Sequence, residues 1–192
     1  MPGVSAPGIF LVRDVSRFAT AVRLGHEARR SPRAGLRRND VSQRLDIFRA
    51  APDALKAMIA LSDYVNGCGL EKSLLHLVKL RASQINGCAN CIHMHFHEAI
   101  ADGETADRLI LLDAWRETTA YTSREQAALA WTEALTLVAE SHAPDEVYEQ
   151  VRAEFTEADI MRLSVAITTI NAWNRLAIGA RVMPRVALKA AA

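Results

Sequence analysis

Two cysteines and a histidine stand close together in the sequence, with a spacing that suits redox chemistry. Cys88 and Cys91 form a Cys-x-x-Cys motif, and His95 follows one helical turn after Cys91. An α-helix advances by about 100° per residue, so the three side chains fall within an arc of about 60°. A dithiol at the beginning of a helix has a lowered pKa and can cycle between thiol and disulfide. A nearby imidazole can accept a thiol proton at neutral pH.

The residues just before the motif predict where its helix begins. Asn86-Gly87 is typical of a turn or a helix end, so Cys88 should lie in the first turn of a new helix. Free backbone N–H groups and the positive end of the helix dipole favour a thiolate there. Taken alone, this reasoning makes Cys88 the better nucleophile. The alternative is that both cysteines are buried structural residues.

Three further histidines lie near the motif. His76 precedes Cys88 by 12 residues, and in an antiparallel hairpin it would lie roughly level with His95. It could then end a short proton relay to the thiols, or be an ordinary surface or core histidine. His93 and His97 point away from Cys88 and are spaced to bind a metal as a pair, although solvated or interface positions are more common for such histidines.

A zinc site is the competing interpretation of the motif. Cys88, Cys91 and His95 would supply three ligands, and His76 the fourth. Three ligands on contiguous turns of one helix fit tetrahedral geometry poorly, so we expect neither a metal nor another cofactor. Cys68, in a glycine-rich turn, is interpreted as an incidental thiol.

Composition limits the classes of protein that the chain can belong to. It has 192 residues, of which half are hydrophobic, and a formal net charge of +1. That length suits one well-buried domain, and the charge indicates neither a nucleic acid nor a membrane as partner. No apolar run is long enough to span a bilayer, and we find no secretory signal. An odd number of cysteines with a Cys-x-x-Cys indicates a reducing compartment, so we expect a cytoplasmic protein.

The first 40 residues differ from the remainder of the chain. Residues 1–40 contain eight arginines but only three acidic residues. We interpret them as a basic, disordered N-terminal extension, and residues 41–192 as the functional domain. A misassigned start site near Val41, or a basic targeting or binding arm, are the other interpretations.

Hydrophobic periodicity predicts helices along residues 41–192 and no strands. A helix apolar on two sides, such as that over 71–85, should be central and buried. Capping boxes are predicted at Ser123–Gln126 and Thr156–Asp159. The fold class is therefore all-α, a bundle of about six to seven helices. The expected helices span 51–66, 71–85, 88–101, 105–115, 123–140, 144–155 and 156–178.

Three segments together resemble a known family. The core stretch Leu77–His95, with the sequence LVKLRASQINGCANCIHMH, is similar to the core of the AhpD-like alkylhydroperoxidases of the carboxymuconolactone decarboxylase superfamily. Residues 127–136 and 171–178 also resemble that family. The resemblance extends over about residues 41–183 and leaves out residues 1–40.

The resemblance implies a fold, an activity and partners. Members are all-α, assemble as trimers or hexamers, and reduce organic hydroperoxides with thiols as antioxidant defence. It implies that Cys91 is attacked by peroxide, that Cys88 resolves it, and that His95 deprotonates Cys91. The implied reductant is a lipoylated or thioredoxin-like dithiol protein, and no bound cofactor is implied. We expect the peroxide pocket between the apolar faces of the two central helices.

The chain departs from the family pattern at two positions. His76 stands where the family's relay has a glutamate, and Asn90 stands where some members have a histidine. Two other functions are therefore kept. One is a redox-responsive protein in which Cys88–Cys91 oxidation alters an interface with negligible turnover, and the other is a zinc-binding module.

Overall fold

The computed structural model describes residues 42–186, and the predicted extension over residues 1–40 lies outside them. Between residues 42 and 186 the chain forms eight α-helices and one 3-10 helix, and no strand. The all-α prediction is confirmed. The elements are α2 (Pro52–Asn66), α3 (Lys72–Asn86), α4 (Ala89–Ala101), α5 (Ala106–Leu111), η1 (Leu112–Glu117), α6 (Ser123–Thr136), α7 (Val138–Ser141), α8 (Asp145–Glu154) and α9 (Glu157–Ala180).

Two expected helices are each divided in the structure. The helix predicted over 105–115 becomes 3-10 from Leu112, and Ala114 has a non-helical backbone. The helix predicted over 123–140 ends at Thr136, and Leu137 separates it from the single turn of α7. Hydrophobic periodicity runs through both breaks, so it did not reveal them.

Side-chain caps fix the starts of α6 and α9. The capping box of α6 pairs Thr122 with Glu125, one residue earlier than the predicted Ser123–Gln126. At α9 only half of the predicted capping box is present: the Thr156 hydroxyl accepts a bond from the backbone N–H of Asp159, but the Asp159 carboxylate accepts from the Thr156 hydroxyl and not from its backbone N–H. Each cap satisfies an otherwise unpaired N–H and helps to determine where the helix begins.

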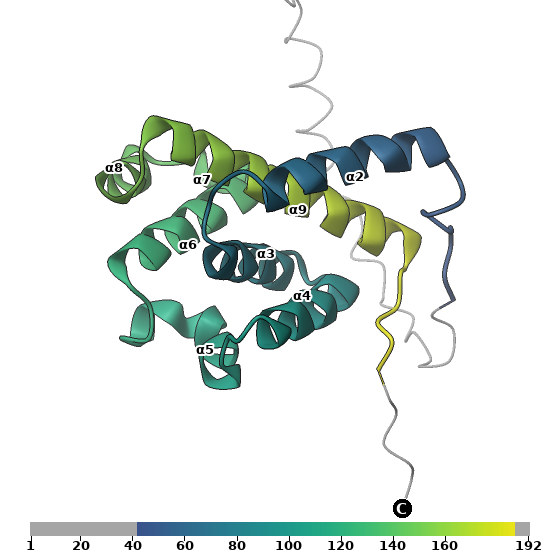
Figure 1. Cartoon of the computed structure of the whole chain (residues 1–192), viewed down its shortest axis with the longest axis horizontal. Helices are drawn as coiled ribbons and strands as arrows, with labels where there is room; N and C mark the ends of the chain where they lie inside the picture. Colours follow the sequence, from purple (N-terminus) through teal and green to yellow (C-terminus); the bar gives the residue numbers. More distant parts are fainter. Residues whose placement is uncertain (1–41, 187–192) are drawn as a thin grey trace, which may run out of the picture. The chain divides into compact units, whose positions relative to one another are not determined.

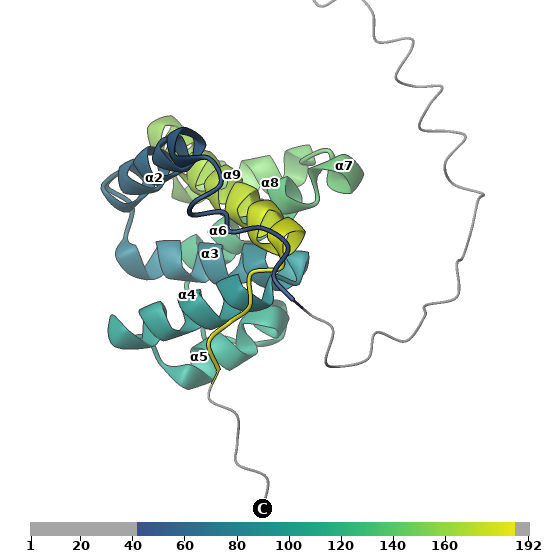
Figure 2. The same ribbon diagram turned by 90° about the vertical axis from the view of Figure 1, so that its right-hand side faces the viewer.

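Helix α3 is the centre of the bundle, as its apolar sides predicted. It packs against α4, α6 and α9 (Figures 1 and 2). Leu74 and Val78 join one buried cluster with α6, α8 and α9, whereas Leu77 and Leu80 join a second with α5 and η1. Both figures place α2 and α9 on one side of α3 and place α4 and α5 on the other.

Candidate functional site

A left-handed glycine turns the chain from α3 into the Cys-x-x-Cys motif. Gly87 ends α3 with φ 69°, a conformation that costs a residue with a Cβ. The N–H of Cys88 then bonds the carbonyl of Ser83 at 3.0 Å. Cys88 is the N-cap of α4 and does not lie in its first turn, so the predicted position is one residue out. The predicted helix end at Asn86-Gly87 is confirmed.

A buried network of amides ties this turn to α9. The Asn86 side chain donates to the side-chain oxygens of Asn171 and Asn174, both at 2.9 Å. Asn174, which is fully buried, donates in turn to the Ser83 hydroxyl at 3.1 Å. Buried polar groups that are all paired hold a unique geometry, so this network positions the backbone that carries Cys88.

Cys88 and Cys91 are joined by a disulfide. Both are almost completely buried, with 1% and 3% of their surface exposed. The backbone N–H of Cys91 approaches the sulfur of Cys88 at 3.4 Å. After reduction this N–H, at the positive end of α4, would stabilise negative charge on Cys88.

A cavity of about 690 Å³ opens beside one cysteine of the pair. Cys91 lines it and Cys88 does not. Its walls come from α2, α3, α4 and α9, and not only from the two central helices that the sequence predicted. Apolar side chains dominate the walls: Ile47, Phe48, Ile59, Val65, Leu75, Met94, Ala166, Ile170, Trp173, Ala177 and Val182.

His95 lines this cavity and is oriented by a carboxylate. Its Nδ1 lies 2.8 Å from Glu98 Oε2, one turn further along α4. The hydrogen bond from His95 holds the pKa of Glu98 below its usual value, so Glu98 accepts and Nδ1 carries the proton. Nε2 is then the basic nitrogen, and it is buried with no hydrogen-bond partner among residues 42–186.

His76 forms a second histidine–carboxylate pair on the same cavity. Its Nε2 lies 2.6 Å from Asp102 Oδ2, and Lys72 Nζ lies 2.7 Å from the other carboxylate oxygen. These bonds from Lys72 and His76 lower the pKa of Asp102. Nδ1 of His76 is buried and has no partner in the described part of the chain.

The structure therefore brings together three of the four predicted site residues around one cavity. Cys91, His95 and His76 line it, and Cys88 is bonded behind Cys91. The expectation that His76 lies roughly level with His95 agrees with this arrangement. No direct hydrogen bond links the two imidazoles, so a proton passing between them would need a water or a substrate oxygen.

Glu98 and Asp102 were missed by the sequence analysis. Both signals are local, because Glu98 follows His95 by three residues and Asp102 follows Glu98 by four, which places them along one face of α4.

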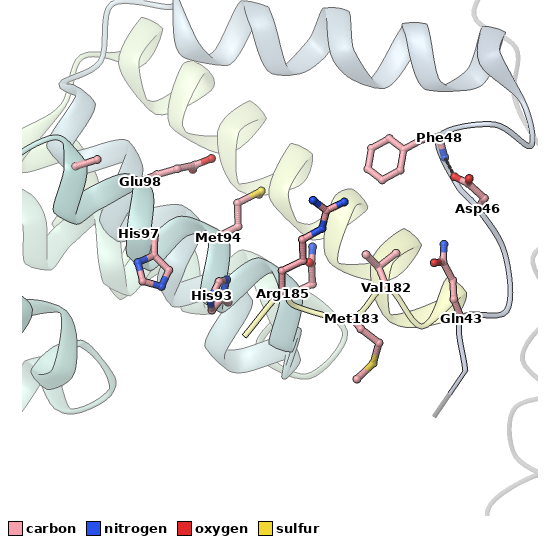
Figure 3. A pocket seen from close by; sticks show the side chains of 12 residues that line it. Gln43, Asp46, Phe48, His93, Met94, His97, Glu98, Val182, Met183 and Arg185 are labelled. Atoms are coloured by element: carbon pink, nitrogen blue, oxygen red, sulfur yellow. Dashed lines mark hydrogen bonds between the residues drawn. The ribbon is translucent and has the colours of Figure 1, made fainter. Parts of the chain in front are cut away.

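The remaining histidines of α4 line a second, more open hollow of about 850 Å³ (Figure 3). His93 and His97 lie with their ring centroids 4.5 Å apart, on the side of the hollow that faces Arg185. Phe48 and Asp46, from the segment before α2, lie at its other end. No group of three or more His, Cys, Asp or Glu side chains within residues 42–186 is arranged to hold a metal ion.

Cys68 is separate from the motif. It is a free, half-buried thiol that packs against the core cluster of α3, α6 and α9. It does not line the cavity beside Cys91.

The sequence has a relative that it matches over nearly the whole of that relative's length. It is 38% identical over 138 residues to the uncharacterized protein YdfG of Bacillus subtilis (strain 168), covering 72% of this chain and 94% of the relative. Residues 52–134 match the model of the carboxymuconolactone decarboxylase family. The chain belongs to this family. The predicted family membership is therefore confirmed, and residues 52–134 include the whole Cys-x-x-Cys segment.

Among solved structures, the chain is similar to AhpD-like proteins. A protein of unknown function from Agrobacterium tumefaciens, named as a candidate antioxidant defence protein AhpD, is 44% identical. That likeness covers 76% of this chain and 100% of the other, with a TM-score of 0.75. The debrominase Bmp8 shares the fold at 16% identity and a TM-score of 0.63, over 70% of this chain and 73% of its own. This family member has no helix within residues 42–186 that is long and apolar enough to cross a membrane.

Proposed function

We propose that the protein is a thiol-dependent peroxidase that reduces organic hydroperoxides through the Cys88–Cys91 pair. The observation that carries the proposal is the position of Cys91. It lines an apolar cavity together with His95, whose unpartnered Nε2 is the basic nitrogen, while Cys88 lies bonded behind it. A nucleophile, a base oriented by a carboxylate, and a second thiol within reach are the groups that a two-cysteine peroxidase requires.

The reaction begins with the reduced pair. His95 Nε2 takes the proton of Cys91, and the thiolate attacks one oxygen of the hydroperoxide. The O–O bond breaks, the sulfur becomes a sulfenic acid, and the alkoxide leaves as an alcohol after receiving a proton from the imidazolium. Glu98 stabilises the imidazolium in the meantime.

Cys88 completes the oxidative half. Its sulfur attacks the sulfenic sulfur of Cys91, the disulfide forms, and the hydroxyl leaves as water. In sum, one hydroperoxide and two thiols give an alcohol, water and a disulfide. His76, held by Asp102, is proposed to relay protons at the cavity through a bound water, in place of the family's glutamate.

An external dithiol then restores the pair by exchange. The attack is expected at Cys91, because that sulfur lines the cavity, and Cys88 is expected to leave as a thiolate stabilised by the N–H of Cys91. Burial of both sulfurs favours a dithiol on a slender arm, such as a lipoyl group, over a thioredoxin-like surface. Assembly as a homo-oligomer is proposed by analogy with the family.

Peroxide consumption with excess dithiothreitol tests the proposal. Wild type should turn over cumene hydroperoxide many times, and Cys91→Ser should abolish this. A wild type that forms and reduces its disulfide readily, but consumes no more than one equivalent of peroxide, would instead favour the redox-responsive function.

A further inference from the structure

Two lysines line the cavity beside Cys91, and only one of them has a carboxylate partner. Lys72 is paired with Asp102. Lys79 Nζ donates to the neutral amide oxygen of Asn66 at 2.8 Å. Between residues 42 and 186, no carboxylate lies within ion-pair distance of Lys79.

Lys79 is costly to keep charged in this position. It is half-buried, and burial lowers the pKa of its ammonium group. Glu98 acts on it favourably from a distance, but that carboxylate is already bonded to His95. A partly desolvated ammonium without a counter-ion is stabilised by any anion that reaches it.

The surroundings of Lys79 indicate what kind of anion would fit. Leu75, Ile170 and Trp173 line the same cavity, whose volume of about 690 Å³ has room for an alkyl chain. Cys91 and His95 line the cavity from α4, whereas Lys79 lines it from α3. A ligand that satisfies all three parts has a hydrocarbon body, an anionic group for Lys79, and a reactive group for Cys91.

We propose that Lys79 determines specificity by binding the carboxylate of an amphipathic substrate, so that the preferred substrates are hydroperoxides of fatty-acid type. The hydroperoxide part rests on the proposed peroxidase function, whereas the carboxylate site does not. Lys72 does not serve the same purpose, because Asp102 already neutralises it. Arg185 is exposed to solvent, and it lines only the second hollow, the one that His93 and His97 also line.

A binding experiment tests the carboxylate site without any turnover. The full-length, disulfide-bonded protein is titrated calorimetrically with decanoate and with 1-decanol. We expect wild type to prefer decanoate, and Lys79→Gln to weaken decanoate binding about tenfold, as the loss of a charge-assisted hydrogen bond implies. Lys79→Arg, which keeps the charge, should retain the preference, and Lys56→Gln, an exposed change on α2 outside the cavity lining, should change it less than about twofold.

A kinetic experiment tests the substrate class. The ratio of kcat/KM for a fatty-acid hydroperoxide to that for its methyl ester should exceed one in wild type and fall about tenfold in Lys79→Gln. Decanoate binding that Lys79→Gln and Lys56→Gln weaken equally, or not at all, would overturn the carboxylate site. Lys79-dependent binding without any hydroperoxide turnover would refute the peroxidase and keep the site. If hydroperoxides are turned over but Lys79→Gln does not change the ratio of the two kcat/KM values, the peroxidase function would stand and the specificity role of Lys79 would be refuted.

Discussion

His95 Nδ1 lies 2.8 Å from the carboxylate of Glu98, while Nε2 of the same ring is buried on the cavity that Cys91 lines and has no partner among residues 42–186. The carboxylate thereby fixes the tautomer in which Nε2 is the base. In this chain the acidic group that orients the base comes from the motif helix itself. The family's glutamate would come from the preceding helix, where this chain has His76.

Replacing Glu98 tests this orientation. In Glu98→Gln the amide can donate to Nδ1 and favour the tautomer with its proton on Nε2, which removes the base. We expect kcat/KM for cumene hydroperoxide to fall by about tenfold or more, as when other oriented bases lose their carboxylate. Glu149→Gln, an exposed change on α8, is the matched control and should leave the rate unchanged. Equal rates in Glu98→Gln and wild type would contradict the assignment.

His76 offers a separate test of the proton relay. Its Nδ1 faces no partner within the described residues, and its Nε2 is held by Asp102. We expect His76→Gln to lower kcat about tenfold with little change in KM, because general acid–base groups contribute about a hundredfold or more when they act directly. His97→Ala, on the outer hollow, serves as the control. Steady-state kinetics with the same loss in both variants would show a general effect and no relay.

A prediction about pH concerns Glu133, a half-buried residue of α6 that is bonded to side chains of α3 and η1. Burial raises its pKa, but the hydrogen bonds from Trp115, Arg116 and Arg81 outweigh burial, so the pKa lies below its usual value. The unfolded chain therefore binds a proton more readily than the folded chain, and Glu133 contributes stability above the unfolded pKa of about 4.3 that is lost as pH falls through the folded pKa.

Urea unfolding of wild type and Glu133→Gln at several pH values measures this contribution. At pH 7 we expect the variant to be less stable by about 3 kcal/mol, because Arg81 loses a buried partner. The difference should shrink below pH 4. A difference that is constant from pH 7 to pH 3 would mean that the carboxylate charge is not the source of the stability.

Asn174 tests the network that supports the cysteine turn. It is fully buried, accepts a hydrogen bond from Asn86 and donates one to Ser83. Asn174→Ala should lower the free energy of unfolding by about 2 kcal/mol, because it removes two hydrogen bonds and leaves the buried Ser83 oxygen without its donor. Thr168→Ala, which removes an exposed hydroxyl bonded within α9, should change it by less than about 0.5 kcal/mol. Chemical denaturation of both variants, with the disulfide intact, gives the comparison.

The sequence predicted the fold and the reactive face of α4 because those features are local. Helical periodicity identified the helices, Asn86-Gly87 indicated the end of α3, and the spacing of Cys88, Cys91 and His95 placed them on one face. Where a helix breaks without a change in hydrophobic pattern, as at Leu137, the prediction was wrong. The catalytic roles of these residues remain predictions.

The full lining of the cavity could not be predicted from the sequence, because its walls come from segments that are far apart in the chain. Trp173 on α9 and Ile59 on α2 line one cavity with Cys91 only after the bundle has formed. The sequence likewise does not reveal that Asp102 pairs with Lys72 and leaves Lys79 without a carboxylate partner among residues 42–186. From its position at the start of a helix, Cys88 was favoured as the nucleophile. That argument takes account of the helix dipole but not of the cavity, which Cys91 lines and Cys88 does not.

Trapping the sulfenic acid tests the central claim most directly. A Cys88→Ser variant that also carries Cys68→Ser is treated with one equivalent of cumene hydroperoxide in the presence of dimedone, and the adduct is located by peptide mass spectrometry. We expect one adduct, on Cys91, together with one equivalent of alcohol. No adduct on Cys91, or an adduct on Cys88 in the reciprocal Cys91→Ser variant with undiminished peroxide consumption, would contradict the account.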